Sequence, residues 1–276
     1  GRRMKNPWYF VLPALLMIGI FFMVPIMNMA RLSLSVQDGF GFDNYAAFFS
    51  KPHQTDALVR SVQLAAMSTM ISSVIAWPLA IFLAFCITSR YRLICVLLLL
   101  APFWTSFTIR AFSWQLVLSD NGVIASALTF FVGSQVTLDV LYTMSASVLG
   151  LTLFGTMLTT LTLFGAMMAI ERHLVEAAAS LGAKPWSVFR DIILPLAAPG
   201  WAVGVTLTFV ISLGDYAVPT LLGGGLKPVL AQLMLSTVKG TYDLPAAATM
   251  AMLLVLVILM AGIPLATHKL IRERIG

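Results

Sequence analysis

Charged residues are scarce in this chain, at 10% of 276 residues, whereas hydrophobic residues make up 59%. Its two cysteines and three histidines are too few and too scattered to indicate a disulfide framework or a metal site. No cluster of His, Cys, Asp or Glu has catalytic spacing, which argues against a membrane-embedded enzyme. A Gly-x-x-x-x-Gly-Lys-Ser/Thr phosphate loop is also missing, so any nucleotide is expected to bind elsewhere.

Long apolar runs are what the chain has instead. With a mean hydropathy of +0.94, the composition predicts an all-α polytopic membrane protein. A helix needs roughly 20 residues to cross a hydrocarbon core of about 30 Å. The uncharged stretches that could span it are 6–30, 61–89, 93–109, 140–170, 192–214 and 244–268. Polar and glycine residues interrupt a seventh window, 121–138, which we expect to be interfacial or re-entrant.

The cations indicate an orientation, because Lys and Arg near span ends are retained on the cytoplasmic side. With six spans and both termini cytoplasmic, the inner set is Arg2, Arg3, Lys5, Arg90, Arg92, Arg172, Lys184, Arg190, Lys269, Arg272 and Arg274. The outer set is smaller: Arg31, Lys51, Arg60, Arg110, Lys227 and Lys239. A seventh span at 121–138 would move the basic loop 172–190 outside, so the distribution favours six. The excess of Lys and Arg in the inner segments also explains the net charge of +6, so the charge does not indicate a nucleic-acid partner.

One long connection, at about residues 171–198, is predicted on the cytoplasmic side between the fourth and fifth spans. Leu174 and Ala178 recur at helical spacing, and Gly182 can end a helix in the left-handed conformation. Pro185 suits the first turn of a second helix. The loop is therefore predicted to form a helix, a bend and a second helix, which either rests among the lipid headgroups or docks on a partner.

A motif in this loop favours docking. It consists of Glu-Ala-Ala, three residues, Gly, nine residues, Ile, one residue and Leu-Pro, formed here by Glu176, Ala177, Ala178, Gly182, Ile192, Leu194 and Pro195. The pattern resembles the EAA loop of permease subunits of type I binding-protein-dependent ABC importers. The resemblance assigns these residues, together with Ala183 and Trp186, to coupling with an ATPase.

The resemblance extends over nearly the whole chain. Segments 102–106 (Pro-Phe-Trp-Thr-Ser), 121–124 (Asn-Gly-Val-Ile) and 214–219 (Gly-Asp-Tyr-Ala-Val-Pro), with Arg110 and Trp114, are similar to the spermidine/putrescine permease branch. A polyamine is the substrate that this implies. The alternatives are an opine, a phosphonate, thiamine or ferric iron, which related branches carry. A secondary transporter is a remote alternative, because it would usually have repeated halves and several buried ionisable residues.

The family also implies partners, and a single domain over residues 1–276. Such a subunit is a non-catalytic, multi-pass component of the bacterial inner membrane that forms half of a translocation pore. A second permease, expected to be a paralogue, forms the other half. Two cytoplasmic ABC ATPases bind ATP and Mg²⁺, and a periplasmic binding protein delivers the substrate.

Ionisable residues at membrane depth are functional candidates because they are costly there. Asp215 lies about 20 residues into the fifth span, near its outer end, and Arg110 ends the third span at a comparable depth. We predict a substrate path formed by Asp215 and Arg110 with Trp104, Trp114 and Tyr216. Its carboxylate and aromatic faces would suit a protonated polyamine through ion pairing and cation–π contacts. Alternatively, Asp215 and Arg110 pair with each other or meet water at the interface.

Overall fold

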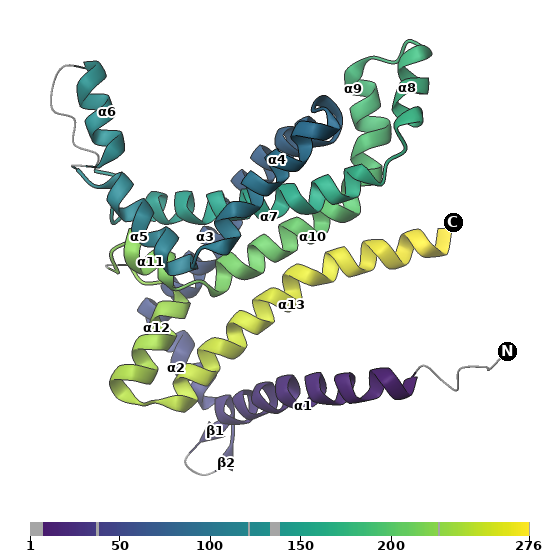
Figure 1. Ribbon diagram of the computed structural model, residues 1–276. Helices are drawn as coiled ribbons and strands as arrows, with labels where there is room; N and C mark the ends of the chain where they lie inside the picture. Colours follow the sequence, from purple (N-terminus) through teal and green to yellow (C-terminus); the bar gives the residue numbers. More distant parts are fainter. Residues whose placement is uncertain (1–7, 37–38, 121, 133–138, 226, 276) are drawn as a thin grey trace. The chain divides into compact units, whose positions relative to one another are not determined.

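The computed structural model describes residues 8–36, 39–120, 122–132, 139–225 and 227–275 (Figure 1). Its α-helices are α1 (Trp8–Ser33), α2 (Asp43–Ser50), α3 (Pro52–Ile81), α4 (Ser89–Leu100), α5 (Phe107–Leu118), α6 (Val123–Val132), α7 (Met144–Met168), α8 (Arg172–Ser180), α9 (Pro185–Val188), α10 (Leu194–Gly214), α11 (Ala217–Leu222), α12 (Leu230–Ser236) and α13 (Leu244–Ile275). Shorter elements are the π-helices η1 (Phe82–Cys86), η3 (Phe189–Ile193) and η4 (Thr237–Thr241), the 3₁₀ turn η2 (Ala101–Trp104), and strands β1 (Ser35–Val36) and β2 (Gly39–Phe40).

Six helical runs among the described residues are long and apolar enough to cross a membrane. They are Val11–Ser33, Pro52–Cys86, Phe107–Val132, Met144–Met168, Pro185–Gly214 and Leu244–Gly262. The prediction of an all-α membrane fold with six spanning segments is therefore confirmed.

The boundaries predicted for the third span are wrong. Residues 93–109 do not form one helix: α4 ends at Leu100, η2 follows, and the backbone is extended at Thr105 before α5 begins at Phe107. Pro102, which cannot donate a helical hydrogen bond, lies in the first turn of η2, where the α-helix gives way to the 3₁₀ turn. A second break follows α5, where the backbone is extended at Ser119. The run Phe107–Val132 therefore consists of two separate helices, α5 and α6, and residues 123–132 of the window 121–138 are helical. Asn121 and residues 133–138 lie outside the described residues.

The chain divides into two compact units, residues 1–56 with 233–257 and residues 57–232 with 258–276. In the first unit, a short antiparallel hairpin pairs Ser35 with Phe40 just after α1. The Asn44 side chain of α2 donates to the carbonyl oxygens of Ser33 and Ser35 at 3.1 and 2.8 Å, and the Tyr45 hydroxyl lies 3.0 Å from the Ser33 hydroxyl. These bonds fix the end of α1. The expectation of a single domain stays a prediction.

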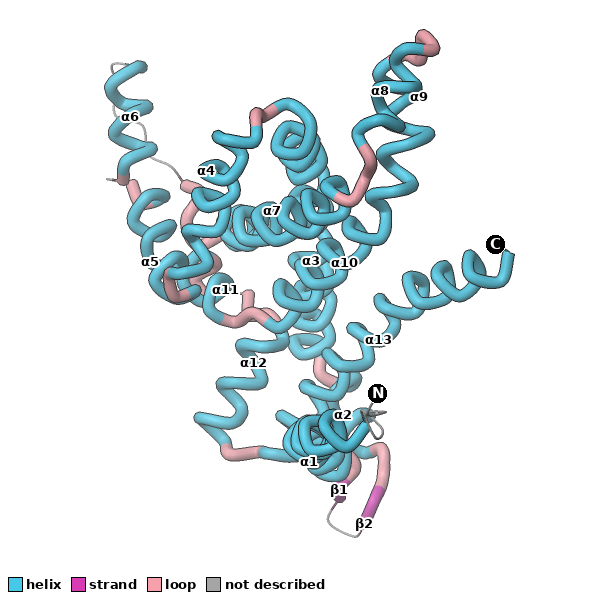
Figure 2. Tube along the Cα trace, turned by 45° about the vertical axis from the view of Figure 1, so that its right-hand side comes forward, coloured by secondary structure: helices cyan, strands magenta, loops and turns pink. Residues whose placement is uncertain are grey.

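Small and hydroxylated side chains hold the second unit together, where α3, α7 and α10 run close to one another (Figure 2). A Cβ atom at Gly155 or Gly204 would collide with side chains of the facing helices, so the backbones approach closely there. The hydroxyls of Thr159 and Thr208 lie 3.0 Å apart between α7 and α10. The Ser72 hydroxyl donates to a carbonyl oxygen of α7 at 2.9 Å. Packing and hydrogen bonds replace the hydrophobic effect, which is weak between helices inside a membrane.

Candidate functional site

The loop after α7 has the predicted helix, bend and helix. Helix α8 ends at Ser180, and Gly182 takes the left-handed conformation with φ of +79°. The N–H of Gly182 donates to Ala179 O at 3.0 Å, and the N–H of Ala183 donates to Ala178 O at 3.1 Å. This pair of bonds is a Schellman motif, which satisfies carbonyls at a helix end and favours glycine at the bend. The sequence prediction for Gly182 is therefore confirmed.

The second helix of the loop is continuous with the fifth span. Pro185 occupies the first turn of α9, which leads through η3 into α10, so that Pro185–Gly214 is a single helical run. Ile192 lies in η3, while Leu194 and Pro195 open α10. Any displacement of α9 is therefore carried directly into the fifth span.

The loop also rests on two other spans through a set of buried residues that we call the coupling cluster. Its members come from α3 with η1, from α7 and the residues just after it, and from α9, η3 and α10: Ala76, Ala80, Ala84, Leu163, Met167, Ile170, Val188, Ile193 and Ala197. The loop residues Val175, Ala178, Ala183 and Ile192 pack against this cluster. These small or apolar side chains connect α8 and the bend to the cluster.

The opposite face of the loop is exposed and partly apolar. The exposed fraction is 89% for Leu181 and 70% for Trp186, and Glu176 and Ala177 are exposed beside them. Large apolar side chains that protrude from an otherwise polar loop are typical of a protein-docking surface. The nine predicted coupling residues thus divide between a face that packs on the spans and a face open to a partner.

The loop is linked to α3 and α10 by contacts of Ser73, Trp77 and Trp201, which the sequence analysis did not single out. The ring of Trp77 lies 5.4 Å from Phe189, edge to face, and 6.1 Å from Trp201. The Trp201 indole N–H donates to the Ser73 hydroxyl at 2.6 Å. Phe189 in turn lies 5.3 Å from Trp186. A polar serine within the apolar run of α3 was the one available signal, because a buried hydroxyl needs a partner.

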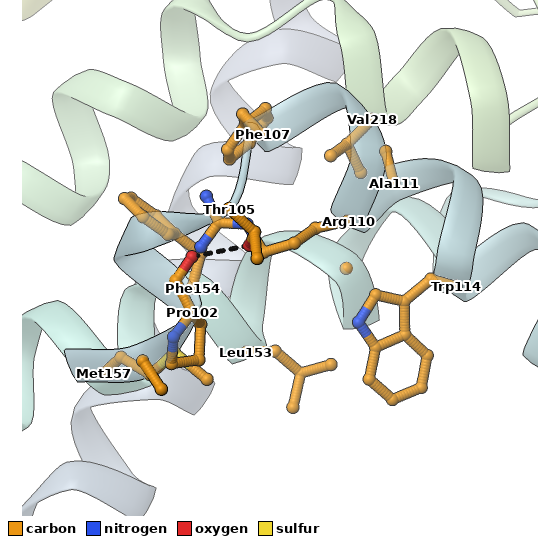
Figure 3. Close-up of a pocket in the computed structure, with 12 residues that line it drawn as sticks. Pro102, Thr105, Phe107, Arg110, Ala111, Trp114, Leu153, Phe154, Met157 and Val218 are labelled. Atoms are coloured by element: carbon orange, nitrogen blue, oxygen red, sulfur yellow. Dashed lines mark hydrogen bonds between the residues drawn. The ribbon is translucent and has the colours of Figure 1, made fainter. Parts of the chain in front are cut away.

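A second feature is a pocket of about 430 Å³ between η2, α5, α7 and α11 (Figure 3). Arg110 and Trp114 of α5 line it together with Pro102, Phe154 and Met157 among others. The Arg110 guanidinium lies over the rings of Phe107 and Phe154, at 5.2 and 4.8 Å from their centroids. The structure therefore brings two of the five predicted path residues into one pocket whose only charged side chain is cationic.

Asp215 does not line this pocket but caps a short helix. Its carboxylate accepts the N–H groups of Ala217 and Val218 at 2.9 and 3.2 Å, at the start of α11. Burial raises the pKa of the Asp215 carboxyl to about 6, against the opposing effect of those two donors. No ion pair joins Asp215 to Arg110 among the described residues. Asp215 follows the last residue of the fifth span, Gly214, so its position near a span end agrees with the prediction.

Trp104 and Tyr216, the other predicted path residues, are exposed and also lie outside the pocket lining. Within the described part of the chain, no three His, Cys, Asp or Glu side chains gather closely enough to hold a metal ion. The structure accordingly offers a loop with an exposed apolar face and a cationic pocket.

Comparisons with known proteins agree with this geometry. The family profile of the binding-protein-dependent transport system inner membrane component matches residues 1–275. The inner membrane ABC transporter permease protein YdcU of Escherichia coli (strain K12) is 31% identical over 203 residues, covering 69% of this chain and 64% of YdcU, slightly less than two thirds of its length. The spermidine/putrescine transport system permease protein PotB of Salmonella typhimurium (strain SL1344) is 28% identical over 238 residues, or 86% of this chain and 82% of PotB.

A solved structure has the same fold. A chain of a bacterial ABC transporter involved in the import of the acidic polysaccharide alginate superposes with a TM-score of 0.75 at 20% identity, covering 92% of this chain and 93% of that one. The family match over residues 1–275 and the six apolar helical runs place the chain in the inner membrane. The chain belongs to the family of binding-protein-dependent transport system inner membrane components and is the permease subunit of an ABC importer.

Proposed function

We propose that this permease forms half of a pore for polyamines and is driven by an ATPase that docks on the loop at about residues 171–198. The observation that carries the proposal is the two-faced loop. Leu181 and Trp186 protrude from one face, while Ala178 and Ala183 pack against the coupling cluster on the other. A partner bound to the exposed face would move α3, α7 and α10 together, because the loop packs against a cluster that these three helices share.

The ATPase-coupling residues proposed here are those of the motif and its neighbours: Glu176, Ala177, Ala178, Gly182, Ala183, Trp186, Ile192, Leu194 and Pro195. The docking loop and both termini are proposed to lie on the cytoplasmic side, as the excess of Lys and Arg in those segments favours. ATP and Mg²⁺ would then bind to the partner ATPases, since this chain lacks a phosphate-binding loop. A second permease, expected to be a paralogue, and a periplasmic binding protein would complete the importer.

A polyamine is proposed as the substrate because of the similarity to PotB over 86% of the chain. Asp215, Tyr216 and Trp104 are the side chains that we propose for the path of a cation, since a carboxylate and aromatic faces both attract protonated amines. That Arg110 and Trp114 lie on this path stays a prediction. A guanidinium would repel a polyamine, so Arg110 is expected to border the path without binding the substrate.

One reconstitution tests both the importer and its substrate. The assembled complex in lipid vesicles is given its cognate binding protein with putrescine, spermidine, an opine, a phosphonate, thiamine or ferric iron, and ATP hydrolysis is measured. Stimulation by the polyamines alone supports the proposal. Stimulation by any of the other ligands keeps the importer and rejects the polyamine, and the absence of an associated ATPase rejects the coupling role.

A double variant tests the docking face. Leu181→Ser with Trp186→Ser is expected to lower co-purification of the ATPase at least about tenfold, because buried Trp anchors commonly contribute 2 kcal/mol or more to an interface. Phe130→Ser is the matched control, since Phe130 on α6 is also strongly exposed but lies outside the loop. Equal co-purification of both variants would place the ATPase contact elsewhere.

A further inference from the structure

The Arg110 pocket contains an unsatisfied charge. Nη1 of Arg110 is buried without a hydrogen-bond partner, and Arg110 forms no ion pair among the described residues. Of the residues that line the pocket, Arg110 is the only charged one, and the others are mainly apolar. The hydroxyl of Thr105 in the lining is already bonded to Pro102 O at 2.8 Å (Figure 3). A cation in such a setting is costly unless an anion reaches it.

The contacts of Arg110 leave its hydrogen-bonding edge available. The rings of Phe107 and Phe154 lie against the guanidinium, at 5.2 and 4.8 Å from its central carbon, and such cation–π contacts use the flat faces of the group. The N–H donors of a guanidinium point outward in its plane, in the fork that suits the paired oxygens of a phosphate. The pocket is therefore prepared for an oxyanion and not for an amine.

The setting of the pocket is that of a membrane surface. Arg110 lies on α5, within an apolar run long enough to cross a membrane, and Ile109, Phe112 and Leu116 of the same helix are exposed. Trp114 also lines the pocket, and tryptophan is enriched at the depth of the lipid headgroups. An amphiphile with an anionic end and an apolar remainder matches this combination. A free inorganic anion would leave the apolar lining uncovered.

We propose that the Arg110 pocket binds the phosphate of a phospholipid, with the apolar part of the lipid along the lining formed by Leu153, Phe154 and Met157 of α7. The pocket would take a different ligand from the cation path proposed for Asp215, Tyr216 and Trp104, which Arg110 is expected to border. It would neutralise Arg110 and fill the space between α5, α7 and α11. Its existence does not depend on which solute the importer carries.

Photolabelling of the assembled complex in nanodiscs tests the site. The probe is a phosphatidylglycerol with a photoreactive acyl chain, and the labelled residues are identified by peptide mapping. The wild type is expected to be labelled on α5 and α7 around the pocket. Arg110→Gln should lower that labelling at least about tenfold, because a charge-assisted pair of hydrogen bonds is lost. Arg110→Lys should retain an intermediate level. Arg90→Gln, which removes an exposed arginine outside the pocket, should leave the pocket labelling unchanged.

Competition in the wild type keeps the test independent of how the variants fold. Unlabelled phosphatidylglycerol should displace the probe, whereas a diacylglycerol with the same chains but no phosphate should not. Equal displacement by both, or undiminished labelling of a well-assembled Arg110→Gln complex, would overturn the proposal. Displacement by inorganic phosphate alone would also overturn it, because the ligand would then be a free anion and no lipid.

Discussion

The two ends of the helical unit formed by residues 57–232 are held together in different ways. At the end with the docking loop, apolar side chains from α3, α7 and α10 interlock in the coupling cluster, and α9 continues into α10 without a break. At the end with the Arg110 pocket, a second buried apolar cluster joins α5 and α11 to α3 and α7, but the chain is broken into short helices there. A carboxylate cap, a backbone bond from Tyr142 N–H to Leu222 O at 2.7 Å, and cation–π contacts also hold these short helices.

This difference indicates that one end is rigid and the other is locally adjustable. An end in which three spans share a packed cluster and α9 continues into α10 is expected to respond to a push as a single body, because close-packed interiors transmit displacement. An end made of short helices joined by extended residues can change its local geometry at Asp215 or Thr105 without disturbing the long helices. The predictions below test whether the first end is rigid and the second adjustable.

The largest effect is expected from Gly182 at the bend of the loop. Gly182→Val forces a β-branched side chain to adopt φ of +79°, where the strain is about 1–2 kcal/mol, so transport driven by the binding protein should fall roughly tenfold. Gly182→Asn is the matched control, because asparagine tolerates the left-handed region. A Cβ atom at this position meets nothing within 4 Å, so crowding cannot explain a difference between the two variants. Equal transport by both would show that the bend does not matter for coupling.

An intermediate effect is expected from Trp77, which joins Phe189 to Trp201. Trp77→Leu removes two aromatic contacts worth about 0.5–1.5 kcal/mol each, so the number of substrate molecules carried per ATP should drop several-fold while ATP hydrolysis continues. Trp77→Phe should recover part of the ratio. Transport and ATP hydrolysis are measured on the same vesicles. If Trp77→Leu carries as many substrate molecules per ATP as the wild type, the aromatic contacts have no role in coupling.

A smaller, local effect is expected from Asp215. Asp215→Ala removes the cap of α11 and should raise the hydrogen-exchange rates of the Ala217 and Val218 amides about fivefold, for a loss of about 1 kcal/mol. Asp215→Asn should exchange nearly as slowly as the wild type, because asparagine caps equally well. Faster exchange spread over the long helices of Asp215→Ala would contradict the view that this end adjusts independently.

The last effect is a pH dependence of stability at the same residue. Because burial raises the pKa of Asp215 to about 6, the folded state holds the proton more tightly than the unfolded state does. The resulting stabilisation is complete below the unfolded pKa of about 3.9 and is lost as the pH rises through about 6. The melting temperature of the wild-type complex should therefore decline more than that of Asp215→Asn over this interval. Parallel melting curves would mean that the carboxyl is not desolvated.

Local patterns predicted the docking loop well. The left-handed bend at Gly182 and the helix start at Pro185 depend on residues within one or two turns, so their spacing in the sequence was sufficient. Hydropathy likewise predicted six spans, because each needs only enough consecutive apolar residues. The predicted boundaries of the third span were wrong, because the prediction gave the uncharged stretch 93–109 more weight than Pro102 within it.

The Arg110 pocket could not be predicted from sequence patterns. The contact between Arg110 and Phe154 joins residues 44 positions apart in the chain, and no local rule brings them together. The role of Asp215 was within reach, because an Asp shortly before a short apolar helix is a common cap. Its depth in the span drew attention to ion pairing with Arg110 instead, and the structure shows the carboxylate bonded to backbone N–H groups.

The π-helix η3, between the docking loop and α10, has a consequence for the kind of motion that can pass along this helix. A π-helical hydrogen bond spans one residue more than an α-helical one, and each residue of an α-helix turns the chain by about 100° around the axis. Converting η3 into regular α-helix would therefore rotate Leu181 and Trp186 around the axis of α10, not simply displace them along it. If an ATPase docks on the loop as proposed, its movement would then rotate the loop about α10 as well as displace it.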